Sequence, residues 1–236
     1  RQTWDYTTMY LIEGEDKAVL IDTGTRCADL DKIVGQITGK PLEVIVTHMH
    51  PDHAGCIKYF DKVWMHRADT VLVPQHAADY QGEFLYMEEG QVFDLGGRKL
   101  EVAWMPGHTP GSVVLLDKAN GDCYSGDAFG SGEVWLQCVP MSPIATFHES
   151  CCRMEKLMKE GHIKDIWCGH YPYLKSSLPL AYIQTMIRIS HRLMNGDQEG
   201  SEPYSNYFIK MPPTARKLAE GRAMIVYDST NIPEAR

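Results

Sequence analysis

The sequence has 236 residues, of which 44% are hydrophobic and 23% charged, and its formal net charge is −8. This composition is typical of a globular protein that is long enough to bury a large core. The negative charge and the absence of long Lys/Arg runs argue against a nucleic-acid or anionic-membrane partner. No apolar run reaches the ~18 residues of a membrane-spanning helix.

The seven cysteines are an odd number and show no regular spacing, which argues against a disulfide framework. Reduced thiols favour a cytoplasmic protein. Because the sequence begins with Arg1, it leaves open whether a signal peptide was removed.

In chain order, the first half predicts short strands separated by helices and polar turns. Two apolar runs around a polar turn form a hairpin pattern, and helical spacing of apolar residues follows. The strands are expected over 9–12, 18–21, 42–46 and 62–66, and the helices over 28–38 and from Pro51 onward. Residues 67–90, which contain Pro74 and Gly82, are expected to form helix and loop.

The second half continues this alternation without a tandem repeat. Two longer helices are expected over 142–160 and 177–195, the second with a buried apolar face. Residues 196–206 are expected to form a loop. The expected strands are 98–105, 113–116, 122–124, 165–168 and 223–227.

The stretch from Thr47 to His53 holds three histidines and one aspartate within six residues. On an extended or loop backbone, the spacing of His48, His50 and Asp52 places their side chains on one side. Imidazoles and carboxylates bind divalent first-row metals, so the stretch predicts a metal site. The other five histidines (His66, His76, His148, His162 and His191) are expected at the surface or in ordinary packing.

An apolar strand stops five times at a small-residue turn that carries His or Asp. If these strand ends share one edge of the sheets, their polar side chains meet at a single site. Together with the cluster they give seven candidate ligands: His48, His50, Asp52, His53, His108, Asp127 and His170. Seven ligands are too many for one ion but suit two metals that share a carboxylate.

These motifs resemble the metallo-β-lactamase superfamily. The chain carries Asp-Thr-Gly, His-x-His-x-Asp-His, Gly-His-Thr-Pro-Gly-Ser, Ser-Gly-Asp and Gly-His in the order of that family, over residues 8 to about 172. The resemblance implies an α/β fold, an αβ/βα four-layer sandwich of two mixed β-sheets with outer helices. It also implies one domain over 1–236, with related halves at roughly 1–118 and 119–236.

The family pattern implies a role for each ligand. His48, His50 and His108 would hold the first metal, and Asp52, His53 and His170 the second. Asp127 would bridge them and Asp22 would orient a ligand imidazole. For Asp52 two alternatives stay open, proton transfer during turnover or simple ligation. The metals are expected to be two divalent ions, zinc first, with iron or manganese as alternatives.

The resemblance implies a hydrolase in which a metal-bridging hydroxide attacks a small ester or thioester carbonyl. The alternative functions are a lactonase or a promiscuous β-lactam hydrolase. An iron-dependent redox enzyme and a metal-stabilised binding domain are less favoured. The sequence leaves the substrate open, and the oligomeric state as well, a homo-oligomer included.

Candidate substrate residues lie near the predicted ligands in sequence: Tyr171, Trp135, Tyr173 and Lys175. Tyr171 follows His170 directly and could bond a substrate oxygen, although core packing is an equal alternative. Within the superfamily, the motifs are most similar to the glyoxalase II-like thioesterases and the acyl-homoserine-lactone type of lactonase. Resemblance to the glyoxalase II branch implies a basic C-terminal segment that binds glutathione. The only nearby candidates are Arg188, Arg192, Arg216 and Lys217.

Overall fold

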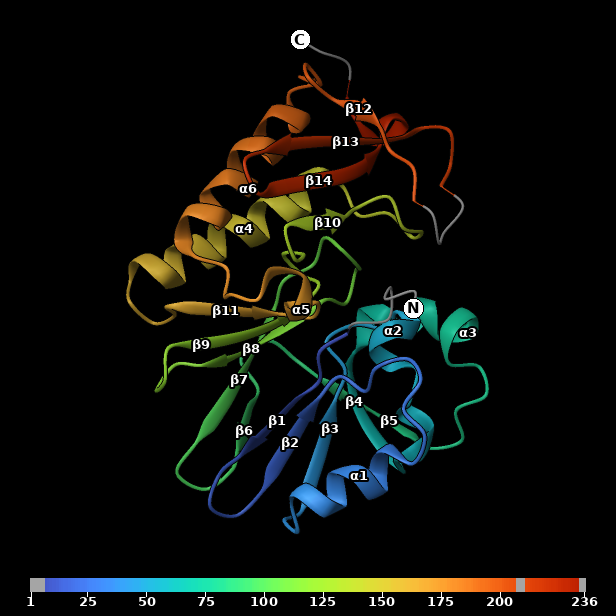
Figure 1. Ribbon diagram of the computed structural model, residues 1–236, viewed down its shortest axis with the longest axis vertical. Helices are drawn as coiled ribbons and strands as arrows, with labels where there is room; N and C mark the ends of the chain where they lie inside the picture. Colours follow the sequence, from blue (N-terminus) through green and yellow to red (C-terminus); the bar gives the residue numbers. More distant parts are fainter. Residues whose placement is uncertain (1–6, 207–210, 234–236) are drawn as a thin grey trace.

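Three β-sheets and the helices that cover them make up the computed structural model, which describes residues 7–206 and 211–233. Figure 1 shows the first two sheets in the lower part of the molecule and the third at the opposite end. None of the described helices is long and apolar enough to cross a membrane.

The first sheet is mixed, with strand order β1-β2-β3-β4-β5. β1 runs antiparallel to β2, and the remaining neighbours pair in parallel. Its strands are β1 (Tyr10–Glu13), β2 (Ala18–Ile21), β3 (Leu42–Ile45), β4 (Lys62–His66) and β5 (Glu83–Met87). All four residues of β2 are buried, as expected for a central strand covered on both faces.

The second sheet has the order β11-β9-β8-β7-β6, and β9 pairs with β11 in parallel while its other pairs are antiparallel. Its strands are β6 (Val92–Asp94), β7 (Lys99–Trp104), β8 (Val113–Asp117), β9 (Asp122–Gly126) and β11 (Asp165–Cys168). One apolar cluster joins Val19 and Ile45 of the first sheet to Val102 and Leu115 of the second. The two sheets therefore pack face to face.

Helices cover the outer face of each of these sheets. Leu30 and Val34 of α1 (Leu30–Ile37) pack on the first sheet. Met154 of α4 (Ile144–Lys159) and Ile183 of α6 (Leu180–Met194) belong to the cluster on the far side of the second. Short helical segments are α2 (Pro51–Ala54), η1 (Ile57–Tyr59), η2 (Arg67–Leu72), α3 (Val73–His76), α5 (Tyr171–Leu174) and η3 (Ser229–Asn231).

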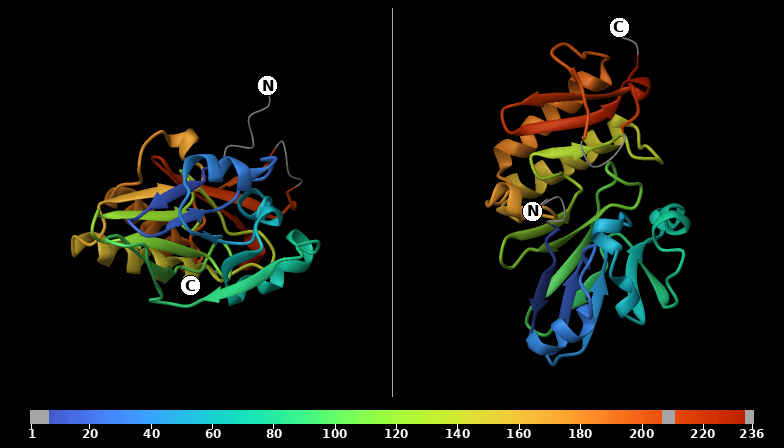
Figure 2. Two further views of the ribbon diagram at one scale, coloured as in Figure 1. Left: turned by 90° about the horizontal axis from the view of Figure 1, so that it is seen from below. Right: turned by 45° about the vertical axis from the view of Figure 1, so that its right-hand side comes forward.

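The third sheet, with order β10-β14-β13-β12, packs on α6. Its strands are β10 (Glu133–Trp135), β12 (Glu202–Pro203), β13 (Ala215–Glu220) and β14 (Ala223–Asp228). Figure 2 shows this sheet at the end of the molecule away from the first sheet. β10 connects it to the centre, because it pairs in parallel with β14 and lies shortly after β9 in the chain.

The predicted α/β sandwich of two packed mixed sheets with outer helices is confirmed, and the described residues form a third sheet as well. The prediction of only helix and loop over 67–90 is wrong, since β5 pairs with β4 at the sheet edge. Partial exposure of most of β5 obscures its pattern in the sequence. The loop expected over 196–206 contains the two-residue strand β12, which is formed only by pairing with β13.

Candidate metal centre

The seven candidate ligands and Asp22 lie at one edge of the two packed sheets. Asp22 follows β2, Asp127 follows β9, and His170 comes two residues after β11. The cluster that begins at His48 follows β3 and runs into α2, where Pro51 occupies the first turn. The structure thus brings together side chains that are up to 148 positions apart, from Asp22 to His170.

The donor atoms form two adjacent groups, and those of each group lie within 4.8 Å of one another. The first group contains His48, His50 and His108, and the second contains Asp52, His53, Asp127 and His170. Asp127 reaches both, since its Oδ2 lies 3.1 Å from Nε2 of His170 and 3.9 Å from Nε2 of His108. Two cation sites that share one carboxylate are consistent with this geometry.

Buried atoms without hydrogen-bond partners point to cations as the occupants. Among the described residues, Nε2 of His48, Nε2 of His53 and Oδ1 of Asp127 are buried and lack a hydrogen-bond partner, and the last two atoms lie 3.5 Å from each other. Such groups are costly unless something binds them, and a divalent metal binds both nitrogen and carboxylate oxygen. A Cβ at Gly169 would lie 2.7 Å from Oδ1 of Asp127, so the backbone leaves this space clear.

Two hydrogen bonds aim the Nε2 atoms of the imidazoles at the centre of the site. Nδ1 of His53 lies 2.7 Å from Oδ2 of Asp22, and Nδ1 of His108 lies 2.7 Å from the carbonyl oxygen of Trp135. An Nδ1–H that donates to each oxygen leaves the Nε2 lone pair for a metal. Asp22 also accepts from the backbone N–H of Thr47 at 2.7 Å, which anchors the start of the histidine cluster.

The electrostatics of the two groups differ. Burial, followed by the neighbouring imidazoles, lowers the pKa of His48, and burial lowers the pKa of His50 to about 3. Burial also lowers the pKa of His108. All three are therefore neutral donors at pH 7, which is the form that binds metal.

In the second group, carboxylates and imidazoles stabilise each other's charges. Burial opposes a charge on His53, yet Asp52 and Asp127 outweigh it and raise its pKa. Burial likewise opposes protonation of His170, but Asp127 and Asp52 raise its pKa to about 12. The pKa of Asp52 falls because His53 and His170 outweigh its burial. The group thus attracts positive charge, which a metal ion would supply in place of protons.

Asp69, which the sequence analysis did not single out, ties together the two loops of the first group. Its fully buried carboxylate accepts from the N–H of Met49 at 2.9 Å, from Oγ1 of Thr109 at 2.9 Å and from the N–H of Gly111 at 2.5 Å. Burial raises its pKa to about 6 despite these donors. No local spacing reveals this role, because the partners lie 20 to 42 positions away.

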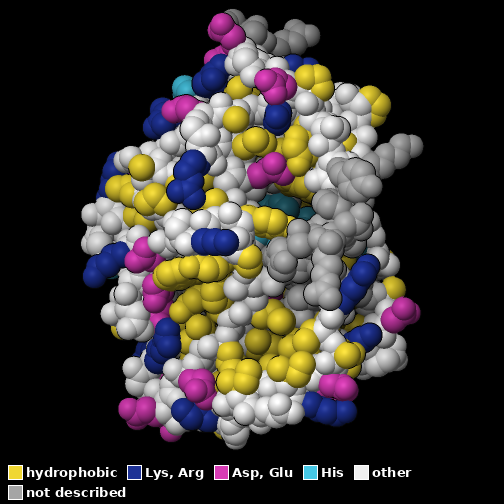
Figure 3. All heavy atoms as spheres, in the orientation of Figure 1, with side chains coloured by type: hydrophobic (Ala, Val, Ile, Leu, Met, Phe, Trp, Pro, Cys, Tyr) yellow, Lys and Arg dark blue, Asp and Glu magenta, His cyan; other side chains and the backbone are white. Residues whose placement is uncertain are grey.

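Residues of both groups line a cavity of about 830 Å³. Figure 3 shows histidine side chains at the bottom of a hollow in this face of the molecule. Trp135 and Tyr173, predicted as substrate residues, line the cavity, whereas Tyr171 and Lys175 are not among its lining residues. The Tyr171 ring lies 5.7 Å from that of Trp167 instead.

Two further cavity residues were not expected from the sequence. His76, assigned to ordinary surface or packing, lines the cavity, and its ring lies 5.8 Å from that of His50. Glu133 of β10 also lines it. Neither belongs to a motif, so only the packing of α3 and β10 around the ligands brings them there.

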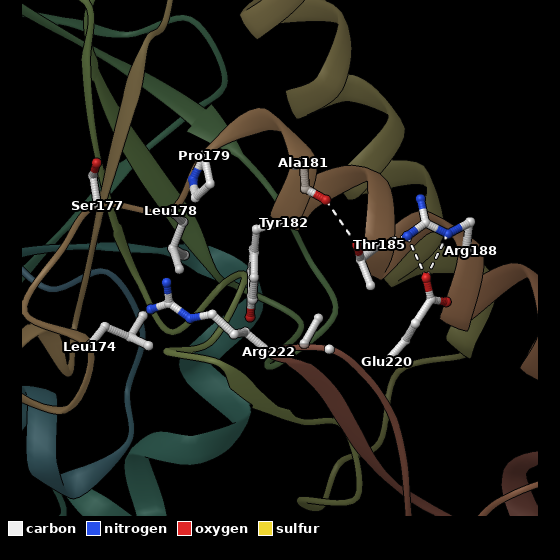
Figure 4. A pocket seen from close by; sticks show the side chains of 12 residues that line it. Leu174, Ser177, Leu178, Pro179, Ala181, Tyr182, Thr185, Arg188, Glu220 and Arg222 are labelled. Atoms are coloured by element: carbon white, nitrogen blue, oxygen red, sulfur yellow. Dashed lines mark hydrogen bonds and ion pairs between the residues drawn. The ribbon is translucent and has the colours of Figure 1, made fainter.

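A second cavity, of about 380 Å³, lies between α5, α6 and the β13–β14 turn (Figure 4). It contains none of the candidate ligands. Arg188 and Glu220 meet at one side of it, with Nη2 of Arg188 and Oε1 of Glu220 2.5 Å apart. Tyr182 also lines this cavity. Its hydroxyl donates to the carbonyl oxygen of Phe129 at 2.8 Å and so stabilises the loop that follows Asp127.

An αβ/βα sandwich with His/Asp donor groups at one edge defines a metal-binding α/β protein. The model of the metallo-beta-lactamase superfamily matches residues 2–148, and the chain belongs to that superfamily. Among curated proteins, it is 26% identical over 202 residues to the acyl-coenzyme A thioesterase MBLAC2 of Homo sapiens, covering 69% of this chain and 72% of that protein. It is 24% identical over 175 residues to a hydroxyacylglutathione hydrolase of Francisella philomiragia, covering 72% and 67%.

Solved structures share the fold. TTHA1623 in a di-iron-bound form matches with a TM-score of 0.60 and 26% identity, over 76% of this chain and 93% of that one. A metallo-beta-lactamase from Pontibacter korlensis matches with a TM-score of 0.61 and 17% identity, over 78% and 87%. The second likeness concerns the fold alone. Superfamily membership and both curated relatives support a hydrolase.

Proposed function

We propose that the protein is a binuclear metal-dependent hydrolase of small esters or thioesters. The single observation that carries the proposal is the pair of adjacent donor groups that share Asp127 and open into a cavity. The thioester-cleaving relatives favour this substrate class over lactones and β-lactams. The seven free cysteines support a cytoplasmic location.

In this proposal, His48, His50 and His108 hold one metal, while Asp52, His53 and His170 hold the other and Asp127 contacts both. When bound, the two metals would supply a nucleophilic water at neutral pH and polarise the carbonyl of the substrate. Zinc, iron and manganese all suit these donors, and the di-iron form of TTHA1623 supports considering iron beside zinc.

The protein's own contribution is to position these groups. Asp22 fixes the ring of His53, and the Trp135 carbonyl fixes the ring of His108. Asp52 has a side chain that is 36% exposed, compared with 15% for Asp127. Of the two carboxylates, Asp52 is therefore the better placed to exchange a proton with substrate or water.

The test is a set of initial rates for metal-loaded protein on an acyl thioester, a simple ester, a lactone and a β-lactam. His108→Ala removes a ligand and serves as the blank, and His162→Ala at an exposed site is the matched control. We expect thioester or ester turnover to be fastest, to fall about 100-fold or more in His108→Ala, and to persist in the control. A lactone preference would favour a lactonase instead, and rates equal to the blank on all four compounds would exclude these hydrolase activities.

A further inference from the structure

The cavity lined by the candidate metal ligands, called the metal cavity below, lacks the positively charged side chains that binding of an anionic thioester requires, as far as its described lining residues show. Apart from the candidate ligands, its lining residues include one charged side chain, Glu133, and none of the described lining residues is Lys or Arg. Coenzyme A and glutathione both carry negative charge, which proteins bind with Arg or Lys. The described lining residues therefore provide no cationic side chain for such a group, and Glu133 would repel it.

The four C-terminal cations that were considered for binding glutathione have partners outside the metal cavity. Arg188 pairs with Glu220 at the second cavity (Figure 4), and Arg192 contacts Asp197 at 2.7 Å. Lys217 lies 3.2 Å from Glu202. Arg216 donates to Ser201 at 2.9 Å. None of these four cations lines the metal cavity.

The carboxylate of Glu133 is fixed in place. Its Oε1 accepts from the Tyr204 hydroxyl at 2.5 Å and from the indole N–H of Trp135. No described residue is a hydrogen-bond or ion-pair partner of Oε2. An oriented carboxylate that lines a cavity and keeps an oxygen available is suited to bind a donor or a cation.

Aromatic rings accompany this carboxylate. Glu133 and Trp135 are two positions apart on β10, so their side chains lie on the same face of the strand. The rings of Trp135 and Tyr204 meet edge to face, with centroids 6.1 Å apart. Trp135 also lines the cavity. A carboxylate beside an indole is the combination that binds ammonium groups, through ion pairing and cation–π attraction.

β10 also sets the distance from the reacting centre. The Trp135 carbonyl accepts from His108, and Glu133 lies about 7 Å further along the strand at about 3.3 Å per residue. If the carbonyl of a substrate lies at the donor groups, the atom that reaches Glu133 is therefore several bonds from the carbonyl carbon. That atom belongs to the acyl group or to the leaving group.

We propose that Glu133, with Trp135, forms a cation subsite that selects substrates whose leaving group carries an ammonium. This inference rests on the proposed hydrolase function and specifies its substrate class. The reaction is an ordinary hydrolysis: water adds to the acyl carbon, the carbon–sulfur bond breaks, and a carboxylic acid and an aminothiol result. Glu133 contacts the ammonium and takes no part in bond breaking.

The experiment uses three butyryl thioesters with leaving groups of different charge. Butyrylthiocholine is cationic, the thioester of 3,3-dimethylbutanethiol is its neutral isostere, and that of 2-mercaptoethanesulfonate is anionic. We expect the kcat/KM of the cationic ester to exceed that of the isostere about tenfold, and the anionic ester to be slowest.

Glu133→Gln tests the residue, because the amide retains an oxygen that can accept from Trp135 and Tyr204 while the charge is removed. We expect this variant to reduce the tenfold preference to about twofold or less. Glu83→Gln, which removes an exposed charge at the far end of β5, should leave the preference unchanged. Thermal unfolding and metal content confirm that both variants are folded.

Equilibrium binding separates this inference from the hydrolase proposal. Choline should bind about tenfold more tightly than 3,3-dimethylbutanol, and Glu133→Gln should abolish the difference. Turnover without charge preference, together with equal binding of the two alcohols, would overturn the subsite and leave the hydrolase intact. Choline binding that depends on Glu133, without turnover of any ester, would support the subsite and overturn the hydrolase. A preference for the anionic ester would overturn the subsite.

Discussion

Asp69 is a buried carboxylate that positions part of the candidate metal centre without being one of its ligands. It accepts from the backbone N–H groups of Met49 and Gly111, which belong to two loops far apart in the sequence. His50 and His108 project from these loops, so the relative position of the first donor group depends on Asp69. The side chain is a positioning residue, not a ligand.

Asp69→Asn should weaken both the fold and the first donor group. The amide replaces one acceptor oxygen with an NH₂ donor, so at least one buried N–H or hydroxyl loses its partner. We expect a loss of about 2 kcal/mol in the free energy of unfolding and a weaker binding of metal. Urea unfolding and a metal-competition titration measure the two effects. Asp79→Asn at an exposed site should change stability by less than about 0.5 kcal/mol, and an equal effect of both variants would contradict the role of Asp69.

At the scale of single residues, the sequence predicts the candidate metal ligands better than the residues that position them. The dense cluster from His48 to His53 indicates metal chemistry by its composition alone, and the structure places its members beside His108 and His170. Asp69 and Glu133 could not be predicted in the same way. Their roles depend on partners that the fold brings near, and a single acidic residue has no distinctive pattern.

At the scale of elements, α4 supports the loop before His108 through close contact. A Cβ on Gly107 would lie 2.9 Å from Cβ of Phe147, and the φ angle of Gly107 is +152°. Ser150, one turn further along α4, donates to the carbonyl oxygen of Pro106 at 2.7 Å. The helix thus fixes the loop that carries His108.

Gly107→Ala should therefore displace this loop. The added methyl group must push the loop or α4 aside, since the contact involves Phe147 backbone as well as side chain. We expect metal affinity to fall about tenfold, with a lower melting temperature. Gly35→Ala is the control, because Gly35 lies in α1 with open space around it and Ala favours a helix. A Gly107→Ala protein with unchanged metal affinity would show that the loop adapts freely.

Elements with strong periodicity were predicted well, whereas several short or partly exposed strands were not. The expected strands at 18–21 and 62–66 coincide with β2 and β4, and the helix expected over 177–195 contains α6. β5, β6, β10, β12 and β13 were missed. β6 and β10 have three residues each and β12 has two, so pairing with neighbours defines them more than their own sequence does.

At the scale of the whole molecule, the motifs identified the fold class because they follow the order of a known family. The composition and periodicity alone favoured only mixed strands and helices. The third sheet was not expected, since it depends on β10 reaching across to β14 near the C-terminal end. The organisation as one domain with two related halves, at 1–118 and 119–236, stays a prediction.

The charge balance of the whole site leads to a prediction about protons. In the metal-free protein, burial opposes protonation of His53 and His170, but carboxylates raise both pKa values, that of His170 to about 12. Because these values lie above the ordinary ~6.5 of an unfolded histidine, the stability that protonation contributes is complete below pH 6.5 and declines as pH rises toward 12.

Metal binding must displace these protons, so we expect loading at pH 7 to release about two protons and metal affinity to rise with pH. Calorimetric titrations in two buffers of different protonation enthalpy give the number released. His170→Ala should release about one proton fewer, whereas His162→Ala should match the unaltered protein. If loading released no protons at pH 7, the imidazoles of His53 and His170 would already be neutral. Another positive charge would then have to balance the carboxylates of Asp52 and Asp127. That result would change the description of the metal-free site, since its stability would then no longer decline above pH 6.5.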